Sequence, residues 1–319
     1  MTKVHRSLLS HLGEPRAVNL NTPYGFQENV PQMTEKLLAY FSTSLHLEVA
    51  ALDLRRYDDA SEEQRQAFKD DVRRANYVFA GPGSPSYALR QWLPMDLTED
   101  LTSVLAQDGV VCFSSAAALT LGRFTPPVYE IYKSGTEPEW LDGLDLMSVV
   151  GLDCVVLPHY NNAEGRDYDT SRCYIGERRL RLLEETLPPG VGVLGIDEHT
   201  AVVIDLATST LTVKGKGEAH WRHEQRVSDF ANGAVVALAD LGARAQDLAP
   251  VAHLAPPTSN LVDAEEVAAL RDAQSRLAEA LNAIRATARA QGHYAIADEI
   301  RDALSASGVV VRDAAVNPR

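Results

Sequence analysis

The stretch Gly109-Val-Val-Cys-Phe-Ser-Ser-Ala-Ala-Ala-Leu-Thr-Leu-Gly-Arg123 decides the fold of this chain, because a strand ends in it and a helix begins at once. Its apolar run, Val110 to Phe113, favours a strand, and small helix-favouring residues follow two serines. Such a turn lifts a side chain out of the sheet edge and aims the N–H groups of the helix start at whatever binds there. Ser115 is therefore a candidate nucleophile. The alternative is that Ser114 or Ser115 only caps the helix.

Strand-length apolar runs alternate with helical patterns from Arg16 to about Ile204. This alternation predicts an α/β fold with a parallel sheet covered on both faces, whose ligand site lies beyond the carboxyl ends of the strands. Past Leu187 the pattern changes to short segments between polar turns, beginning with residues 191–198, and we expect these to be antiparallel strands that close the sheet.

The chain divides into three parts by composition. Residues 1–247 form the predicted α/β domain, residues 248–262 are a proline-containing linker, and residues 263–319 are a helical, alanine-rich C-terminal segment. Two short helices bury little on their own, so we expect them to pack on the main domain or on a second copy of the chain as a homodimer.

Composition excludes several classes of protein. The net charge of −14 over 319 residues argues against a general affinity for nucleic-acid phosphate. The three cysteines are widely spaced, which implies no disulfide framework and no zinc site, and we expect no metal or other cofactor. No segment has the apolar length of a membrane span, and the N-terminus lacks a signal-like apolar run, so the chain is expected to be cytoplasmic and to bind no membrane.

The parts of a serine hydrolase can be assembled around Ser115. A serine hydroxyl needs a base, a group that orients the base, and two N–H donors for the oxyanion. His159 follows an apolar strand and so should lie at the same sheet edge as Ser115, and Glu130 is a candidate for the orienting acid. The N–H groups of Gly83 and Ala116 are candidates for the oxyanion hole.

Four motifs in fixed order resemble the peptidase E and cyanophycinase family of serine peptidases. They are Gly81-Pro82-Gly83-Ser84, Ser115-Ala116-Ala117-Ala118, Pro158-His159-Tyr160 and Gly195-Ile196-Asp197-Glu198-His199-Thr200-Ala201. The resemblance implies a flavodoxin-like three-layer sandwich of the class I glutamine amidotransferase type. It also implies Ser115 as nucleophile, His159 as base and Glu130 as orienting acid. Asp197 and Glu198 are interpreted as structural.

The same resemblance implies a small peptide or amide substrate, such as an aspartyl dipeptide. An acidic substrate needs a basic partner, for which Arg123 and Arg172 are candidates, with Ser84 beside the glycine turn. Phe113 and Ala117 stand where the family prefers glycine, and Pro82 offers no N–H. An inactive relative that binds a small ligand is therefore the alternative to a hydrolase.

The C-terminal segment carries a second resemblance. Residues 285–313 contain Arg-Ala-Thr-Ala-Arg, then Ala-Asp-Glu-Ile-Arg-Asp-Ala-Leu, then glycine and a short β run, which looks like the tail of cysteinyl-tRNA synthetases. The simpler interpretation is a helical hairpin that packs through an apolar stripe. Residues 263–313 hold six arginines against nine acidic residues, so packing is favoured over tRNA contact, and a tRNA-associated accessory role remains the third alternative.

Overall fold

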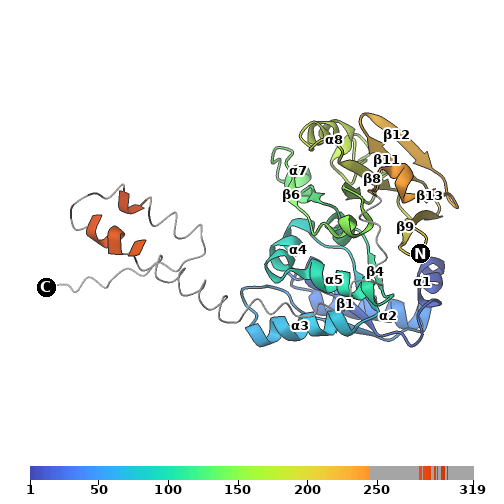
Figure 1. Ribbon diagram of the computed structural model, residues 1–319, viewed down its shortest axis with the longest axis horizontal. Coiled ribbons are helices and arrows are strands. Elements are labelled where there is room, and N and C mark those ends of the chain that lie inside the picture. Colours follow the sequence, from blue (N-terminus) through green and yellow to red (C-terminus); the bar gives the residue numbers. More distant parts are fainter. Residues whose placement is uncertain are drawn as a thin grey trace. The chain divides into compact units, whose positions relative to one another are not determined.

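The chain forms two compact units, Met1–Leu254 and Ala255–Arg319. The computed structural model describes residues 1–244 of the first unit (Figure 1). In the second unit it describes residues 280, 281, 283–288, 291, 293, 296–298 and 300. The predicted linker, residues 248–262, and most of the predicted helical segment lie outside the described residues.

The first unit alternates helices and strands along most of its length, as predicted. Its helices are α1 (Thr2–Leu9), α2 (Val30–Leu45), α3 (Glu62–Arg74), α4 (Pro85–Trp92), α5 (Leu97–Ala106), α6 (Ala116–Leu119), α7 (Val128–Lys133) and α8 (Gly176–Glu184), with short 3-10 turns between some of them. Its strands are β1 (Ala17–Leu20), β2 (Val49–Leu52), β3 (Tyr77–Ala80), β4 (Val110–Phe113), β5 (Phe124–Thr125), β6 (Leu141–Asp142), β7 (Cys154–Leu157), β8 (Gly192–Ile196), β9 (Thr200–Asp205), β10 (Thr210–Gly215), β11 (Ala219–His223), β12 (Arg226–Phe230) and β13 (Val235–Ala237).

The first sheet is parallel throughout, with the strand order β2-β1-β3-β4. Alternation along a strand sends neighbouring side chains to opposite faces. On one face Val18 of β1 packs with residues of α3 and α5, and on the other Tyr77 of β3 packs with Phe41 of α2. Helices therefore cover both faces, which confirms the predicted three-layer α/β architecture.

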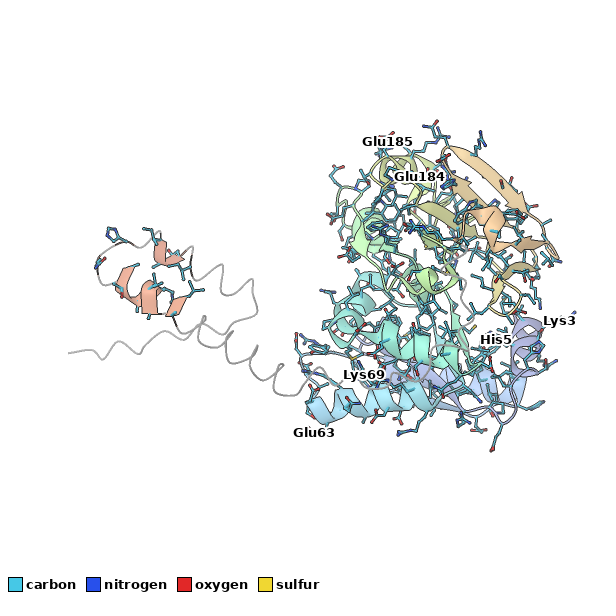
Figure 2. The ribbon with its side chains drawn as sticks, viewed as in Figure 1. Lys3, His5, Glu63, Lys69, Glu184 and Glu185 are labelled. Atoms are coloured by element: carbon cyan, nitrogen blue, oxygen red, sulfur yellow. The ribbon has the colours of Figure 1, made fainter. Side chains whose placement is uncertain are left out.

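Helix α1 covers one edge of this core through His5, which is labelled in Figure 2. His5 is 8% exposed, and its Nδ1 lies 2.6 Å from the hydroxyl oxygen of Tyr77. Burial, with a smaller contribution from the charged N-terminus, lowers the pKa of His5 to about 4. The imidazole is therefore neutral in the folded protein near pH 7.

The second sheet has the order β12-β11-β8-β7 and is mixed. Strands β7 and β8 are parallel, with Val155 opposite Val193, whereas β11 runs antiparallel to both β8 and β12. Strands β9, β10 and β13 form a separate antiparallel sheet. The prediction of antiparallel strands after residue 187 is thus correct for β9 to β13. It is only half correct for β8, which is antiparallel to β11 but parallel to β7, and β9, β10 and β13 form their own sheet and do not close the main one. The parallel pairing places the ends of β7 and β8 at one edge of the sheet.

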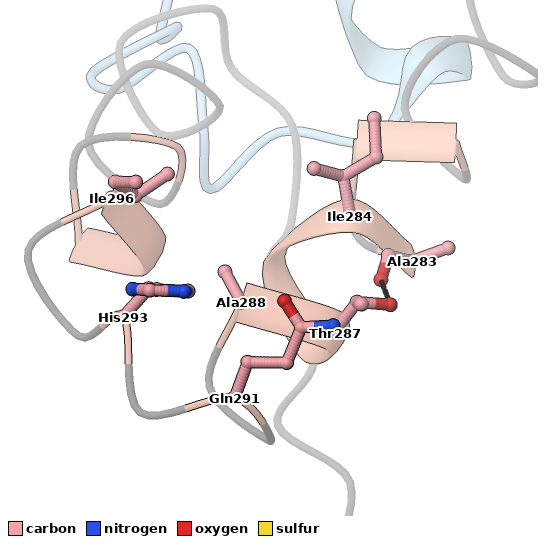
Figure 3. Close-up of a pocket in the computed structure, with 7 residues that line it drawn as sticks. All are labelled: Ala283, Ile284, Thr287, Ala288, Gln291, His293 and Ile296. Carbon is pink, nitrogen blue, oxygen red and sulfur yellow. Dashed lines mark hydrogen bonds between the residues drawn. The ribbon is translucent and has the colours of Figure 1, made fainter.

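Within the second unit, residues 283–288 and 296–298 are helical. They contribute to a hollow of about 370 Å³ (Figure 3). Its lining is mainly apolar and comprises Ala283, Ile284, Thr287, Ala288, Gln291, His293 and Ile296. Among the described residues of the whole chain, no helix has the length and apolar character needed to cross a membrane.

Candidate active site

Ser115 lies in a sharp turn between β4 and α6, as the sequence predicts. Its backbone has φ 52° and ψ −124°, a combination that is strained for any residue with a side chain and costs about 1–3 kcal/mol. The turn is held against the end of β3, since the Ala117 N–H donates to the Gly81 carbonyl at 3.2 Å. The Ser115 side chain makes no capping hydrogen bond to α6. The geometry is that of a nucleophile elbow and not of a simple helix cap.

His159 follows β7 and brings its imidazole to Ser115. Its Nε2 lies 3.0 Å from the Ser115 Oγ, which is hydrogen-bonding distance. The turn that carries His159 is fixed by the next residue, because the Tyr160 N–H donates to the Ile196 carbonyl of β8 at 3.0 Å. Gly195 makes this packing feasible, since a Cβ there would lie 2.4 Å from the Tyr160 ring. The structure therefore places Ser115 and His159 together, as the sequence predicts.

Glu198, and not Glu130, contacts the other nitrogen of His159. Its Oε1 lies 3.0 Å from His159 Nδ1 and also accepts a hydrogen bond from Asn162 Nδ2 at 2.8 Å. The Glu198 N–H in turn donates to Asn161 Oδ1 at 2.9 Å, which fixes the backbone at this position. Hydrogen bonds from Asn162 and then His159 lower the pKa of Glu198, although partial burial opposes them. The carboxylate is thus held ionised beside the imidazole.

Glu130 lies elsewhere, and the prediction that it orients His159 is wrong. It sits on α7, and its Oε1 accepts a hydrogen bond from the hydroxyl of Ser86 on α4. Its other oxygen, Oε2, is buried without a hydrogen-bond partner among the described residues. Proximity in sequence to Ser115 suggested Glu130, whereas Glu198 lies 83 residues after Ser115, in the turn that follows β8.

The two predicted oxyanion donors come from the start of α6 and from the turn after β3, the strand that pairs with β4. Ala116 is the first residue of α6, where a backbone N–H has no partner within the helix. Gly83 has φ 148°, and a Cβ there would lie 2.0 Å from the Pro23 carbonyl oxygen, so no other residue fits. Among the described residues, neither N–H donates to a protein acceptor. Both therefore remain candidates to bind an oxyanion.

The departures from the family pattern leave the elbow intact. Phe113 packs into the core, and its ring centroid lies 5.7 Å from that of Trp92. Ala117 is fully buried, and neither residue has a positive φ. The strain is confined to Ser115 and does not require glycine on either side of it. Pro82 lacks an N–H, but the candidate donor is the next residue, Gly83.

The predicted substrate-binding residues are largely engaged within the protein. Arg123 Nη1 bonds Asp153 at 2.7 Å, and Arg172 Nε bonds Glu177 at 2.8 Å. Partial burial raises the pKa of Glu177, but hydrogen bonds from its arginine partners outweigh this and lower it to about 2. Glu177 is therefore ionised, and Arg172 is held in an ion pair with it. Ser84 caps α4, accepting from the Tyr87 N–H at 3.1 Å. Within the described part of the chain, none of these three side chains forms a hydrogen bond or ion pair with Ser115 or His159.

Together these contacts make a hydroxyl–imidazole–carboxylate line. Such a line can draw a proton from Ser115 to His159 while Glu198 stabilises the resulting imidazolium, which is the arrangement needed for acyl transfer. Metal-ligand spacing is found at another place among the described residues, where Glu218, His220 and Asp229 converge.

The fold has a counterpart among solved structures. The crystal structure of a peptidase from an acI-B1 Actinobacterium superposes with a TM-score of 0.58 at 19% sequence identity, covering 74% of this chain and 90% of that one. A candidate peptidase E protein from Listeria monocytogenes EGD-e gives a TM-score of 0.44 at 16% identity, covering 72% and 93%. The first likeness confirms the fold that the sequence motifs implied. No curated protein matches the chain.

The C-terminal resemblance also has a counterpart. Residues 271–316 match the family model of the cysteinyl-tRNA ligase anticodon binding domain. A basic face for RNA on this segment would need Arg285, Arg289 and Arg301. Arg285 is only 6% exposed, and Arg289 and Arg301 lie outside the described residues.

Proposed function

We propose that the chain is a serine hydrolase that cleaves a small peptide or amide bond without a cofactor. The observation that supports it most is the continuous line from Ser115 Oγ through His159 to Glu198, with both distances at 3.0 Å. A strained serine at a strand–helix turn adds support, because such strain persists where the surrounding structure maintains it for function.

In the proposed reaction Ser115 Oγ attacks the carbonyl carbon of the substrate and passes its proton to His159 Nε2. The N–H groups of Gly83 and Ala116 bind the oxygen that becomes negative. His159 then gives the proton to the leaving amine as the C–N bond breaks. Water, activated by the same imidazole, hydrolyses the acyl-serine ester and regenerates the Ser115 hydroxyl.

The proposed substrate class is a small acidic peptide such as an aspartyl dipeptide. The resemblance to peptidase E suggests a dipeptide with an N-terminal aspartate, and the solved structure with the higher TM-score is described as a peptidase. Arg123 and Arg172 would have to leave Asp153 and Glu177, or share them, to bind an acidic side chain.

The test is labelling of Ser115 by a fluorophosphonate, read by intact mass, alongside hydrolysis of a panel of aspartyl and non-aspartyl dipeptides. We expect one adduct per chain that is lost in Ser115→Ala, and hydrolysis of at least one dipeptide that is lost in the same variant. Absence of both adduct and hydrolysis in the folded wild-type protein would favour the ligand-binding alternative.

A second candidate function concerns RNA and is raised by the match of residues 271–316 to an anticodon binding domain. We propose it as the lesser candidate, because acidic residues outnumber arginines in residues 263–313. Fluorescence anisotropy with a labelled tRNA tests it on the full chain. Affinity that falls with salt and is lost on truncation after residue 262 would support it, and no binding at low salt would reject it.

A further inference from the structure

A cluster of metal-ligating side chains lies on strands β11 and β12, apart from Ser115. Glu218 precedes β11 and His220 lies within it, so the two side chains share one face of the strand. Asp229 of β12 is the register partner of His220. One ligand atom from each of the three residues lies within 4.8 Å of the others. Their spacing is set by a strand pair, which is a more rigid scaffold than a loop.

The orientation of His220 is fixed from behind by a fourth residue, Asp197. His220 Nε2 lies 3.1 Å from Asp197 Oδ1, and Asp197 is only 8% exposed. The other oxygen of Asp197 accepts the Glu218 N–H at 3.0 Å. The ring of His220 also stacks on Tyr160, with centroids 4.6 Å apart. A carboxylate behind a histidine, directing its free nitrogen outward, is the arrangement found around metal-binding histidines.

The carboxylates around His220 favour the binding of a cation. Carboxylate oxygens face both ring nitrogens of His220: Asp197 Oδ1 lies 3.1 Å from Nε2 and Asp229 Oδ1 lies 2.7 Å from Nδ1. A neutral imidazole has only one N–H, so one of these contacts needs a further cation, either a second ring proton or a metal ion bound in place of the proton on Nδ1. Glu218 adds a third carboxylate to the surroundings of this one imidazole. The chain as a whole carries a net charge of −14, which favours a cation further.

We propose that Glu218, His220 and Asp229 bind one divalent transition-metal ion, with Zn²⁺ as the reference ion. One imidazole and two carboxylates are a common ligand set for such ions, and water would complete the coordination. The expectation of no metal rests on cysteine spacing alone, whereas these ligands are a histidine and two carboxylates at two consecutive strands.

The site has a structural link to the candidate active site. Asp197, which holds His220, is the residue before Glu198, which holds His159. A bound ion therefore anchors the backbone segment that carries the Glu198 carboxylate.

The test is calorimetric titration of the metal-free full-length chain with Zn²⁺, together with the visible absorption of the Co²⁺ form as a report on coordination. We expect one ion per chain and at least tenfold weaker binding in Asp229→Asn and in Glu218→Gln, two variants of exposed side chains that keep shape and folding. The matched control is His223→Ala on the same strand, whose side chain stacks on Trp221 and lies outside the cluster; its affinity should equal that of the wild type.

Two outcomes would overturn the proposal. Binding of Zn²⁺ no tighter in the wild type than in Asp229→Asn and Glu218→Gln would mean that the cluster holds a proton and not a metal. Binding that survives in both variants but disappears in His159→Ala would place the ion at the candidate active site instead.

Discussion

Replacing Glu198 by glutamine is the sharpest test of the proposed site, because sequence and structure disagree on which acid serves His159. The substitution keeps the shape of the side chain and removes its charge. Asn162 donates to the same oxygen that faces His159, so the glutamine carbonyl should stay in that position and the His159 tautomer should be preserved. The loss of Ser115 reactivity then measures how much the negative charge of Glu198 stabilises the His159 imidazolium.

The size of the effect follows from Coulomb's law. Charges separated by about 4 Å interact by about 4 kcal/mol at an effective dielectric constant of about 20, and by about 2 kcal/mol at about 40. The Glu198 side chain is 32% exposed, which makes this range appropriate. Since about 1.4 kcal/mol is a factor of ten in rate, Glu198→Gln should lower reactivity by about 30-fold to 1,000-fold.

The assay is the rate of Ser115 labelling by a fluorophosphonate, with kcat/KM on whichever dipeptide is cleaved. The matched control is Glu130→Gln, which keeps the acceptor for Ser86 and should change the labelling rate by less than about threefold. A labelling rate that is unchanged in Glu198→Gln but falls about 30-fold or more in Glu130→Gln would refute the assignment of the acid to Glu198.

Three further predictions concern stability. Because the pKa of His5 is about 4 in the folded protein and 6.5 is its ordinary value, the unfolded chain binds this proton more tightly. The free energy of unfolding should then drop by about 3 kcal/mol from pH 7 to pH 4 relative to His5→Gln, and a pH-independent difference in urea titrations would contradict this. Phe113→Ala should cost about 3 kcal/mol in the same titrations, through lost packing on Trp92, while Ser115 labelling of the folded variant changes less than about threefold. Ser115→Gly should be more stable than Ser115→Ala by about 1 kcal/mol or more, since glycine relieves the strain at φ 52°; equal stabilities would show that the turn is unstrained.

The part of the site that sequence could predict is the part built from local signals. The nucleophile elbow at Ser115 follows from a strand-forming run that stops at small residues, and a short turn has few conformations available. His159 was predicted from the rule that the carboxyl ends of parallel strands in one sheet share an edge. In the structure β4 and β7 belong to different sheets, and the 3.0 Å between His159 Nε2 and Ser115 Oγ shows that their carboxyl ends meet nevertheless. The motif alone suggested that Phe113, where the family prefers glycine, would disturb the turn. In the structure its side chain packs against Trp92, so the turn keeps its conformation.

Glu198 could not be predicted in this way because its position depends on the direction of one strand. Residues 191–198 look like the first of several short antiparallel strands, and an antiparallel β8 would carry Glu198 to the edge opposite His159. In the structure β8 runs parallel to β7, and both His159 and Glu198 lie two residues past the end of their strands. Helix α8 lies in the connection between β7 and β8, and this connection is long enough for β8 to return in the same direction as β7, which neighbouring parallel strands require. The helical pattern of residues 176–184 is therefore the signal, unused in the sequence analysis, that would have set the direction of β8 and so placed Glu198 beside His159.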